Sequence, residues 1–407
     1  MPLLIDANQP PSEVMNHEPR ITPAKILSVH NSYQQPGGED CAFANEALLL
    51  EQNGHTVVRY EDSNHRIESG VVSGLAAIWN ESSYRKLLSV IRSEKPELVH
   101  FHNTFPLISP AGYYAAGKHR IPVVQTLHNY RLLCAGATFF RDGEICEQCI
   151  ERQSLLPALR HACYRDSRAA TAAVITMLAA HRSAGTWQRM VDVFIALTEF
   201  SRRKFVAGGL PSKRIAVKPG VLARDPGIGQ GRGGYALFVA RLCEEKGVRV
   251  LADAWRKLSD IPLKVVGEGP LAGIAWPAGV TRLGRQSRED LLTLVKNAYL
   301  LVVPSIWYEG APGVIMEAFA CGVPVIASDL GALPELVTRG STGLLFKSGD
   351  SADLAIAVRW AFEHPEDMAP MRVAARHEYE SKHSPQENYQ MLLGIYQRAM
   401  ESTRARP

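Results

Sequence analysis

Residues 300–327 read LLVVPSIWYEGAPGVIMEAFACGVPVIA. The apolar run at 300–303 predicts a buried strand, and the run at 323–327 predicts a second one. Between them, Pro312 suits the first turn of a helix and Gly322 suits its end. Two strands joined by a helix at this spacing are typical of a parallel sheet that is covered on both faces.

The same alternation continues through the rest of the chain. Before residue 226 the expected strands are 26–29, 56–58, 98–101 and 122–127, and the expected helices are 42–53 and 110–118. After residue 234 a strand at 235–239, a helix at 247–257 and a strand at 263–266 precede the unit quoted above. Glycines 227, 229, 231, 233 and 234 separate the two blocks. The pattern predicts an α/β protein of two doubly wound domains, with a ligand cleft between the carboxyl ends of their strands.

The composition is that of a globular protein. The chain has 407 residues, of which 46% are hydrophobic, enough for two domains with cores of their own. Lys and Arg number 45 against 41 Asp and Glu, which argues against a nucleic-acid partner. The N-terminus lacks the pattern of a signal peptide, and the longest apolar run of low charge, 169–180, is shorter than the about 20 residues that span a bilayer. We therefore expect a cytoplasmic protein.

One segment is strongly basic. Residues 151–220 contain twelve Lys and Arg against four Asp and Glu, so this segment carries a charge of +8 and the rest of the chain −4. One interpretation is a peripheral contact with the anionic inner face of the cytoplasmic membrane, to which each base contributes about 1 kcal/mol. The other is a solvated face over an ordinary core helix.

Two glutamates lie eight positions apart, at Glu309 and Glu317. Apolar residues such as Ile315 and Phe319 surround Glu317 on the predicted helix. A buried carboxylate there costs several kcal/mol unless it is paired or hydrogen-bonded. Its partners are either sugar hydroxyls, with a ribose at Glu317, a second sugar at Glu309 and a phosphate at the helix start, or an arginine in a structural ion pair.

Two cations, Arg241 and Lys246, follow the predicted strand at 235–239. They either neutralise the diphosphate that leaves when a sugar is transferred, or pair at the surface with Glu244 and Glu245. The chain contains no Asp-x-Asp triplet, so a metal that would neutralise a diphosphate has no obvious ligands. This favours chemistry without a catalytic metal.

Small and polar residues follow three strands of the N-terminal block. Gly37 and Gly38 come after the first strand, and paired glycines let backbone amides approach a phosphate. His100 and His128 lie at later strand ends, where a histidine is either a hydrogen-bond donor or proton carrier in a cleft, or satisfies backbone groups. For His100 the second interpretation is favoured.

These motifs resemble those of the retaining glycosyltransferase family 4, the nucleotide-sugar-dependent enzymes of GT-B fold. The resemblance extends from about Lys25 to the C-terminus and is carried by Glu309 and Glu317 with the GVPVIA run at 322–327. It implies two Rossmann-like domains that face a central cleft. It also implies metal-independent, retaining transfer of a hexose-type sugar from a nucleoside diphosphate to a glycan or polyprenyl-linked acceptor of a bacterial surface polysaccharide. A nucleotide-sugar epimerase of the same fold and a non-catalytic sugar-nucleotide-binding module are the alternatives.

The resemblance also implies a role for each motif. Glu309 contacts the donor sugar, Glu317 the ribose, Arg241 and Lys246 the pyrophosphate, and His128 the sugar near its reacting carbon. The other implied donor contacts are Gly37, Gly38, Gly267, Glu268, Arg285, Gly310, Ala311, Pro312 and Gly313. Ala240 stands where the family commonly has glycine.

The expected domain boundaries combine these patterns. Residues 1–24 are expected as a flexible leader and residues 25–222 as an acceptor-binding domain with a cysteine-rich insertion at 134–163. The hinge covers 223–234 and the nucleotide-sugar-binding domain 235–383. Residues 384–407 are expected as a helix that packs back on the N-terminal domain.

Four of the seven cysteines gather in the insertion, with a Cys-x2-Cys pair at its centre. A disulfide is not expected in a cytoplasmic chain, and this spacing is typical of a structural zinc site. Free buried thiols are the alternative. The zinc ligands would be Cys134, Cys146, Cys149 and Cys163. Cys41, Cys243 and Cys321 are expected as small packing residues.

Overall fold

The computed structural model describes residues 23–34, 37–64 and 71–405, so nearly all of the leader expected at 1–24 lies outside the described residues. The first sheet has six parallel strands in the order β2-β1-β3-β4-β7-β8. Their bounds are β1 Lys25–Ser32, β2 Thr56–Ser63, β3 Leu98–Asn103, β4 Val123–Leu127, β7 Val193–Ala196 and β8 Ile215–Val217.

Helices cover both faces of this sheet because its strands are apolar on both sides. In β1, Ile26 packs on one face beside Leu49 of α1 (Gly38–Gln52), whereas Leu27 packs on the other. The second face is covered by the helices α3 Glu81–Glu94, α4 Ala111–Lys118 and α7 Arg168–Ser183. Three shorter or peripheral helices complete the domain: α2 Val71–Ile78, α8 Thr186–Met190 and α9 Glu199–Ala207.

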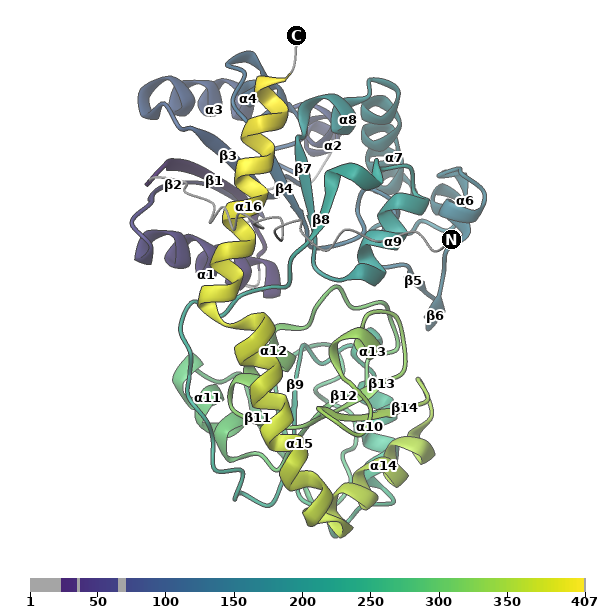
Figure 1. Cartoon of the computed structure of the whole chain (residues 1–407). Helices are drawn as coiled ribbons and strands as arrows, with labels where there is room; N and C mark the ends of the chain where they lie inside the picture. Colours follow the sequence, from purple (N-terminus) through teal and green to yellow (C-terminus); the bar gives the residue numbers. More distant parts are fainter. Residues whose placement is uncertain (1–22, 35–36, 65–70, 406–407) are drawn as a thin grey trace, which may run out of the picture.

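The second sheet repeats this architecture with its own core. Its order is β11-β10-β9-β12-β13-β14, again parallel throughout. The strands are β9 Ala236–Val239, β10 Leu263–Val266, β11 Val280–Gly284, β12 Leu300–Val303, β13 Val325–Ser328 and β14 Gly343–Phe346. The helices are α10 Val248–Trp255, α11 Arg288–Asn297, α12 Gly313–Ala320, α13 Leu333–Leu336, α14 Ser351–Glu363 and α15 Pro365–Glu378. The expected fold of two doubly wound parallel-sheet domains is confirmed (Figure 1).

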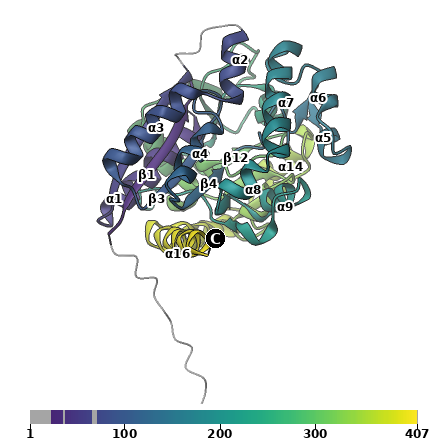
Figure 2. The same cartoon turned by 90° about the horizontal axis from the view of Figure 1, so that it is seen from above.

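The C-terminal helix α16 (Pro385–Arg404) returns to the N-terminal domain. Leu392 and Tyr396 of α16 pack with Ile26, Val124 and Val193 of the N-terminal sheet. In the view from above, α16 lies on one side of β1, β3 and β4, and α3 and α7 lie on the other (Figure 2). The chain therefore crosses between the domains twice, after β8 and before α16.

The cysteine-rich insertion contains only short elements: β5 Phe140–Arg141, β6 Glu144–Ile145, α5 Gln148–Glu151 and α6 Leu156–Arg160. The adjoining α7 buries one side, including Val174 and Leu178, in the domain core. No described helix is long and apolar enough to cross a membrane.

Much of the basic segment 151–220 is occupied by contacts within the protein. Lys218 is buried, Lys204 pairs with Glu147, and Arg203 pairs with Glu335. The +8 charge predicted from composition is therefore not one uniform surface patch.

Candidate active site

Several of the predicted site residues lie in loops that leave the two sheets where the strand order reverses. This point lies between β1 and β3 in the first sheet and between β9 and β12 in the second. Doubly wound folds bind ligands outside the carboxyl ends of strands at such points. Arg241 and Lys246 follow β9, Glu309 follows β12, and Gly37 and Gly38 follow β1.

Lys246 and Glu309 form an ion pair at the edge of the second sheet. The Nζ of Lys246 lies 2.7 Å from Oε1 and 3.0 Å from Oε2 of Glu309. Ser305 donates a hydrogen bond from Oγ to the same Oε1 at 2.6 Å. Gly247 permits this approach, because its φ is +69° and a Cβ there would lie 1.8 Å from the carbonyl oxygen of Pro304. The structure thus brings Lys246 and Glu309 together in one ion pair, whereas the sequence analysis expected them to contact different parts of the donor.

Arg241 and Glu317 also hold partners of opposite charge. The guanidinium of Arg241 lies 2.5 Å from Oε1 of Glu245, and Arg288 donates to Oε1 of Glu317. These are ion pairs of the kind that the sequence left open as alternatives to ligand contacts. The two arginine side chains are 61% and 53% exposed, so a ligand can compete for them without disturbing the core.

The loop of Glu309 and Gly310 touches the N-terminal domain beside His128. A Cβ on Gly310 would lie 3.1 Å from the carbonyl oxygen of His128. Thr198 donates from Oγ1 to the carbonyl oxygen of Gly310 at 3.4 Å. The structure therefore brings the expected sugar-binding loops of the two domains together.

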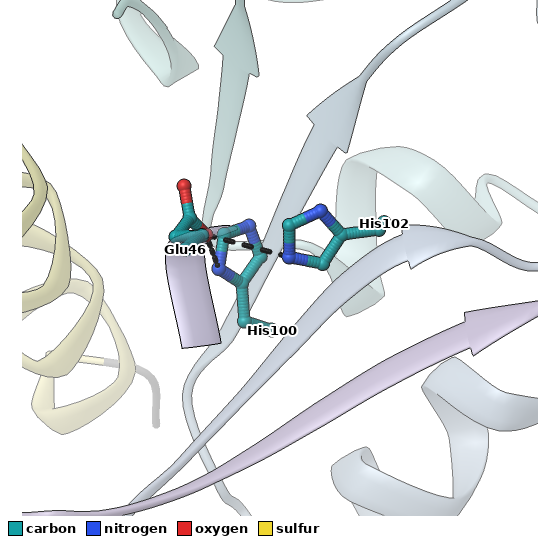
Figure 3. Close-up of side chains that lie close together, drawn as sticks. All are labelled: Glu46, His100 and His102. Atoms are coloured by element: carbon teal, nitrogen blue, oxygen red, sulfur yellow. Dashed lines mark ion pairs between the residues drawn. The ribbon is translucent and has the colours of Figure 1, made fainter. Parts of the chain in front are cut away.

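Behind His128 lies a chain of buried polar side chains, three of which Figure 3 shows. Nε2 of His128 is 3.1 Å from Nδ1 of His102, and Nε2 of His102 is 3.3 Å from Oε1 of Glu46. That carboxylate oxygen is also 2.8 Å from Nδ1 of His100. The other oxygen of Glu46 lies 3.1 Å from Nζ of the buried Lys218. The chain runs from the cleft into the interior of the N-terminal domain.

Burial sets the charges along this chain. It lowers the pKa of His102 to about 4, with a further contribution from His100, and it lowers the pKa of His128 well below the ordinary value. Burial alone would raise the pKa of Glu46, but Lys218 and His100 outweigh it and hold that pKa well below its usual range. At neutral pH two uncharged imidazoles are therefore backed by a carboxylate and an ammonium group.

Glu46, His100 and His102 place three potential metal ligands within 4.8 Å of one another. The positive charge of Lys218 beside Glu46 opposes cation binding. Both ring nitrogens of His100 also have hydroxyl partners, on α16 at 2.9 Å and on β4 at 2.8 Å. The group fits an ion-paired network, and we assign no metal to it.

The glycines predicted at the donor differ in their surroundings. A Cβ on Gly38 or on Gly313 would meet no atom within 4 Å, so the space beside the first residue of each helix is open. The amide of Gly37, in contrast, donates to the Asp40 carboxylate at 2.7 Å. Gly267 has a φ of +134°, and a Cβ there would lie 1.9 Å from the carbonyl oxygen of Ala240. The loop after β10 therefore lies directly against the loop that carries Arg241.

The other predicted contacts lie at the same edge. Glu268 and Arg285 are exposed, and Ala311 and Pro312 lead into α12, with Pro312 as its N-cap. Cys41 in the first turn of α1 is exposed, which corrects its expected role as a packing residue, whereas Cys243 and Cys321 are buried. Partial desolvation raises the pKa of the Cys41 thiol, with smaller influences from Arg288 and Glu317. The start of α1 therefore faces the Glu317 region across the cleft.

The four clustered cysteines line one small cavity in the insertion. Glu147, between Cys146 and Cys149, reaches out of the insertion towards the cleft. It accepts a hydrogen bond from the hydroxyl of Tyr308 at 2.7 Å and pairs with Lys204 at 2.5 Å. The insertion thus touches the residue that precedes Glu309.

Several residues of the site were not predicted from sequence. Glu46 lies in a segment whose pattern indicates only a helix, and Lys218 is one of the twelve bases of the segment 151–220, with no role of its own indicated. Trp307, whose ring centroid lies 4.9 Å from Nζ of Lys246, and Tyr308 precede Glu309 directly. Their aromatic character beside a carboxylate was the one available signal for a sugar site.

Comparison with known proteins finds two glycosyltransferase family models, one for each domain. Residues 50–220 match the family model "Glycosyl transferase 4-like domain" and residues 233–364 match "Glycosyl transferases group 1". The chain is 27% identical over 232 residues to the amylovoran biosynthesis glycosyltransferase AmsK of Erwinia amylovora, covering 51% of this chain and 56% of that protein. It is 32% identical over 146 residues to the D-rhamnosyltransferase WbpZ of Pseudomonas aeruginosa, covering 34% and 38%. The alignments thus span little more than half, or less, of these relatives.

Solved structures of other proteins share the fold of nearly this whole chain. HepE of Anabaena, solved with UDP and glucose, superposes with a TM-score of 0.62 at 19% identity and covers 91% of this chain and 98% of its own. Sucrose-phosphate synthase of Thermosynechococcus elongatus gives a TM-score of 0.61 at 18% identity, with 92% and 98% coverage. The chain therefore has the two-domain GT-B fold, and each of its domains matches a glycosyltransferase family model.

Proposed function

We propose that the protein transfers a hexose-type sugar from a nucleoside diphosphate to an acceptor hydroxyl, with retention of configuration and without a catalytic metal. The observation that carries this proposal is the meeting of two loops across the cleft. The loop with the Lys246–Glu309 pair lies against His128 of the other domain. A sugar diphosphate bound there has cations on one side and a neutral imidazole on the other.

The cations suit a departing diphosphate. Lys246 and Arg241 lie at the carboxyl end of β9, and negative charge develops on the diphosphate as the glycosidic bond breaks. When the diphosphate binds, it takes over these cations from Glu309 and Glu245. Glu309 is then free to accept hydrogen bonds from hydroxyls of the donor sugar, and Glu317 from those of the ribose.

The proposed transfer needs no base from the protein. The acceptor oxygen bonds to the anomeric carbon on the face that the diphosphate leaves, and the hydroxyl proton passes to the departing phosphate oxygen. The low pKa of His128 suits this scheme, because an uncharged ring can orient a sugar hydroxyl without competing for the proton.

A basic concavity beside the cleft suits an anionic acceptor. It has a volume of about 570 Å³ and its lining contains no acidic residue. Neither Arg152 nor Arg160 has an ion-pair partner within the described part of the chain. Gln148 of the same lining follows Glu147, which touches Tyr308. We propose that a phosphate-bearing acceptor, such as a glycan on a polyprenyl diphosphate, binds here, with the protein at the inner face of the membrane.

The test begins with thermal-shift measurements against UDP, GDP, ADP and dTDP, which select the donor base. Radiolabelled sugars of that nucleotide are then incubated with extracted lipid acceptors in the presence and absence of EDTA. We expect label in the organic phase, unaffected by EDTA, and an α-linked product from an α-linked donor. Epimerised donor without release of nucleoside diphosphate would contradict the proposal, and so would label that never leaves the nucleotide.

The acceptor site has its own test. The double variant Arg152→Ser/Arg160→Ser should raise the acceptor KM about thirtyfold and leave the donor KM unchanged, because each lost cation–phosphate contact is worth roughly 1 kcal/mol at an exposed site. The control is Arg168→Ser/Arg189→Ser, which removes two bases of the same segment that do not line the concavity. Equal effects of both pairs would favour a diffuse membrane contact.

A further inference from the structure

The hydrogen-bond chain behind His128 determines which of its ring nitrogens carries the proton. His102 is neutral, so one of its nitrogens donates and the other accepts. Its Nε2 faces the carboxylate of Glu46 at 3.3 Å, and an unprotonated nitrogen there would face an anion. The proton of His102 therefore lies on Nε2, where it faces the carboxylate in an electrostatic contact whose geometry is not that of a hydrogen bond.

The same reasoning extends to His128. With its proton on Nε2, His102 presents an unprotonated Nδ1 to Nε2 of His128 at 3.1 Å. His128 must donate from Nε2 to form this bond, which leaves its own Nδ1 unprotonated. Nδ1 of His128 has no hydrogen-bond partner among the described residues, so its lone pair is available to a ligand.

The buried end of this row of polar side chains, at Glu46, is held by two segments of the polypeptide that lie next to the crossings between the domains. Lys218, next to Glu46, lies just after β8 and donates to Oδ1 of Asn388 at 2.8 Å. Asn388 belongs to α16. Glu46 is therefore fixed from several sides, and its position depends on both inter-domain crossings.

We propose that Glu46 is a positioning residue for sugar transfer, which acts through His102 to keep His128 in the tautomer whose Nδ1 accepts a hydrogen bond from a donor-sugar hydroxyl. This inference rests on the proposed function. Glu46 touches no substrate, and its effect is exerted through its electrostatic contact with His102 and the hydrogen bond between His102 and His128.

The test compares two double variants that differ in one property. Glu46→Gln/Lys218→Met keeps an acceptor for His102, whereas Glu46→Leu/Lys218→Met removes it, and neither leaves a buried charge unpaired. Thermal unfolding and donor KM establish that both fold and bind. We expect kcat of the leucine variant to be about 10–100-fold below that of the glutamine variant, at an unchanged donor KM.

Nitrogen NMR of histidine-labelled protein reads the tautomer directly. His128 should carry its proton on Nε2 in the wild type and in the glutamine variant, and should become a mixture of tautomers in the leucine variant. An unchanged tautomer and equal kcat values would overturn the inference. Near-normal turnover of His128→Ala, in contrast, would overturn the proposed role of His128 while the tautomer result could still stand.

A separate observation concerns the four-cysteine cluster. Cys134, Cys146, Cys149 and Cys163 line one cavity of about 20 Å³, room for a single atom. All four thiols are free.

The insertion also needs an added source of stability. Five of the ten described non-glycine residues with positive φ lie within 134–163, where each such residue is strained. The helices and strands of the insertion have two to five residues each, too few for a core of their own. We infer that the cluster binds one structural zinc ion, which holds Glu147 against Tyr308. No three of the four sulfurs, all of them in described residues, lie within 4.8 Å of one another, so these side chains would turn towards the cavity when zinc binds.

Elemental analysis of untagged protein, purified without chelator and then supplied with zinc, tests this inference. We expect about one zinc per chain, lost in Cys146→Ser and retained in the matched control Cys321→Ser, a buried cysteine outside the cluster. Chelation should lower the Tm of the wild type and leave that of zinc-free Cys146→Ser unchanged. Less than about 0.1 zinc per chain after reconstitution would overturn it.

Discussion

The two sides of the cleft are built on opposite electrostatic principles. On the C-terminal side, the guanidinium groups of Arg241 and Arg288 reach solvent and hold pairs that a ligand can exchange, whereas Lys246 is 22% exposed and pairs with the buried Glu309. On the N-terminal side, His128 is neutral, and the charged pair behind it is buried. Exposed pairs rearrange at little cost, whereas a buried network keeps one geometry. Under the proposed function, charge neutralisation and precise orientation of the donor would therefore be supplied by different domains.

The strongest way to break this comparison is to remove the central cation. Lys246→Met should lower kcat by about 10²–10³-fold, because a preorganised charge at the leaving diphosphate is lost. The matched control is Lys257→Met, an exposed lysine of the same domain outside the cleft. Steady-state kinetics with saturating donor measures the effect. If Lys246→Met raised only the donor KM, the cation would serve binding and not the transfer step.

Glu309→Gln tests the role of the carboxylate that pairs with Lys246. We expect kcat/KM for the donor to fall about 10–100-fold, since a hydrogen bond from a sugar hydroxyl to a charged group is worth roughly 1.5–3 kcal/mol. The double variant with Lys246→Met should be less impaired than the product of the single effects, because the two residues are in contact. Strictly multiplicative effects would indicate that the ion pair of the ligand-free protein has no bearing on catalysis.

The sequence predicted the C-terminal side better than the N-terminal side, for a physical reason. Lys246 and Glu309 lie in loops directly after strands, where strand periodicity and glycine spacing locate them. Glu46 lies in the middle of α1, and only the packing of α1 against β3 and α16 brings it to His100, His102 and Lys218. Contacts of this kind depend on tertiary structure, so no local sequence pattern predicts them. An ion pair between Glu317 and an arginine was one of the alternatives expected from the sequence. The sequence did not indicate that Arg288 is the arginine.

The buried side should be sensitive to acid. The pKa of His102 is about 4 in the folded protein against 6.5 when unfolded, so between these values the unfolded chain binds more protons and stability falls as pH falls. From pH 7 to pH 5 His102 should contribute a loss on the order of 2 kcal/mol, at 1.36 kcal/mol per pKa unit. Urea unfolding at both pH values measures it.

A variant isolates this contribution. His102→Gln can still donate to Glu46 and accept from His128 but does not titrate, so its stability should fall less between pH 7 and pH 5 than that of the wild type. The exposed His119 provides the control, and His119→Gln should lose as much as the wild type. An equal loss in all three proteins would show that His102 is not the group that makes the N-terminal side acid-sensitive.

The smallest expected effect concerns the contact that joins the two sides. Tyr308→Phe removes the hydrogen bond from Tyr308 to Glu147 but keeps the ring against Phe139 and Phe200, and Glu147 retains Lys204. Because no buried charge is left unpaired, we expect kcat to fall only about threefold, with unchanged Tm. Tyr299→Phe, which loses a hydrogen bond to a backbone carbonyl far from the cleft, is the control and should leave kcat unchanged. A much larger loss of kcat in Tyr308→Phe would mean that the insertion sets the distance between the charged and the neutral side of the cleft. The two sides would then be coupled more strongly through the Tyr308–Glu147 contact than through the loop of Gly310.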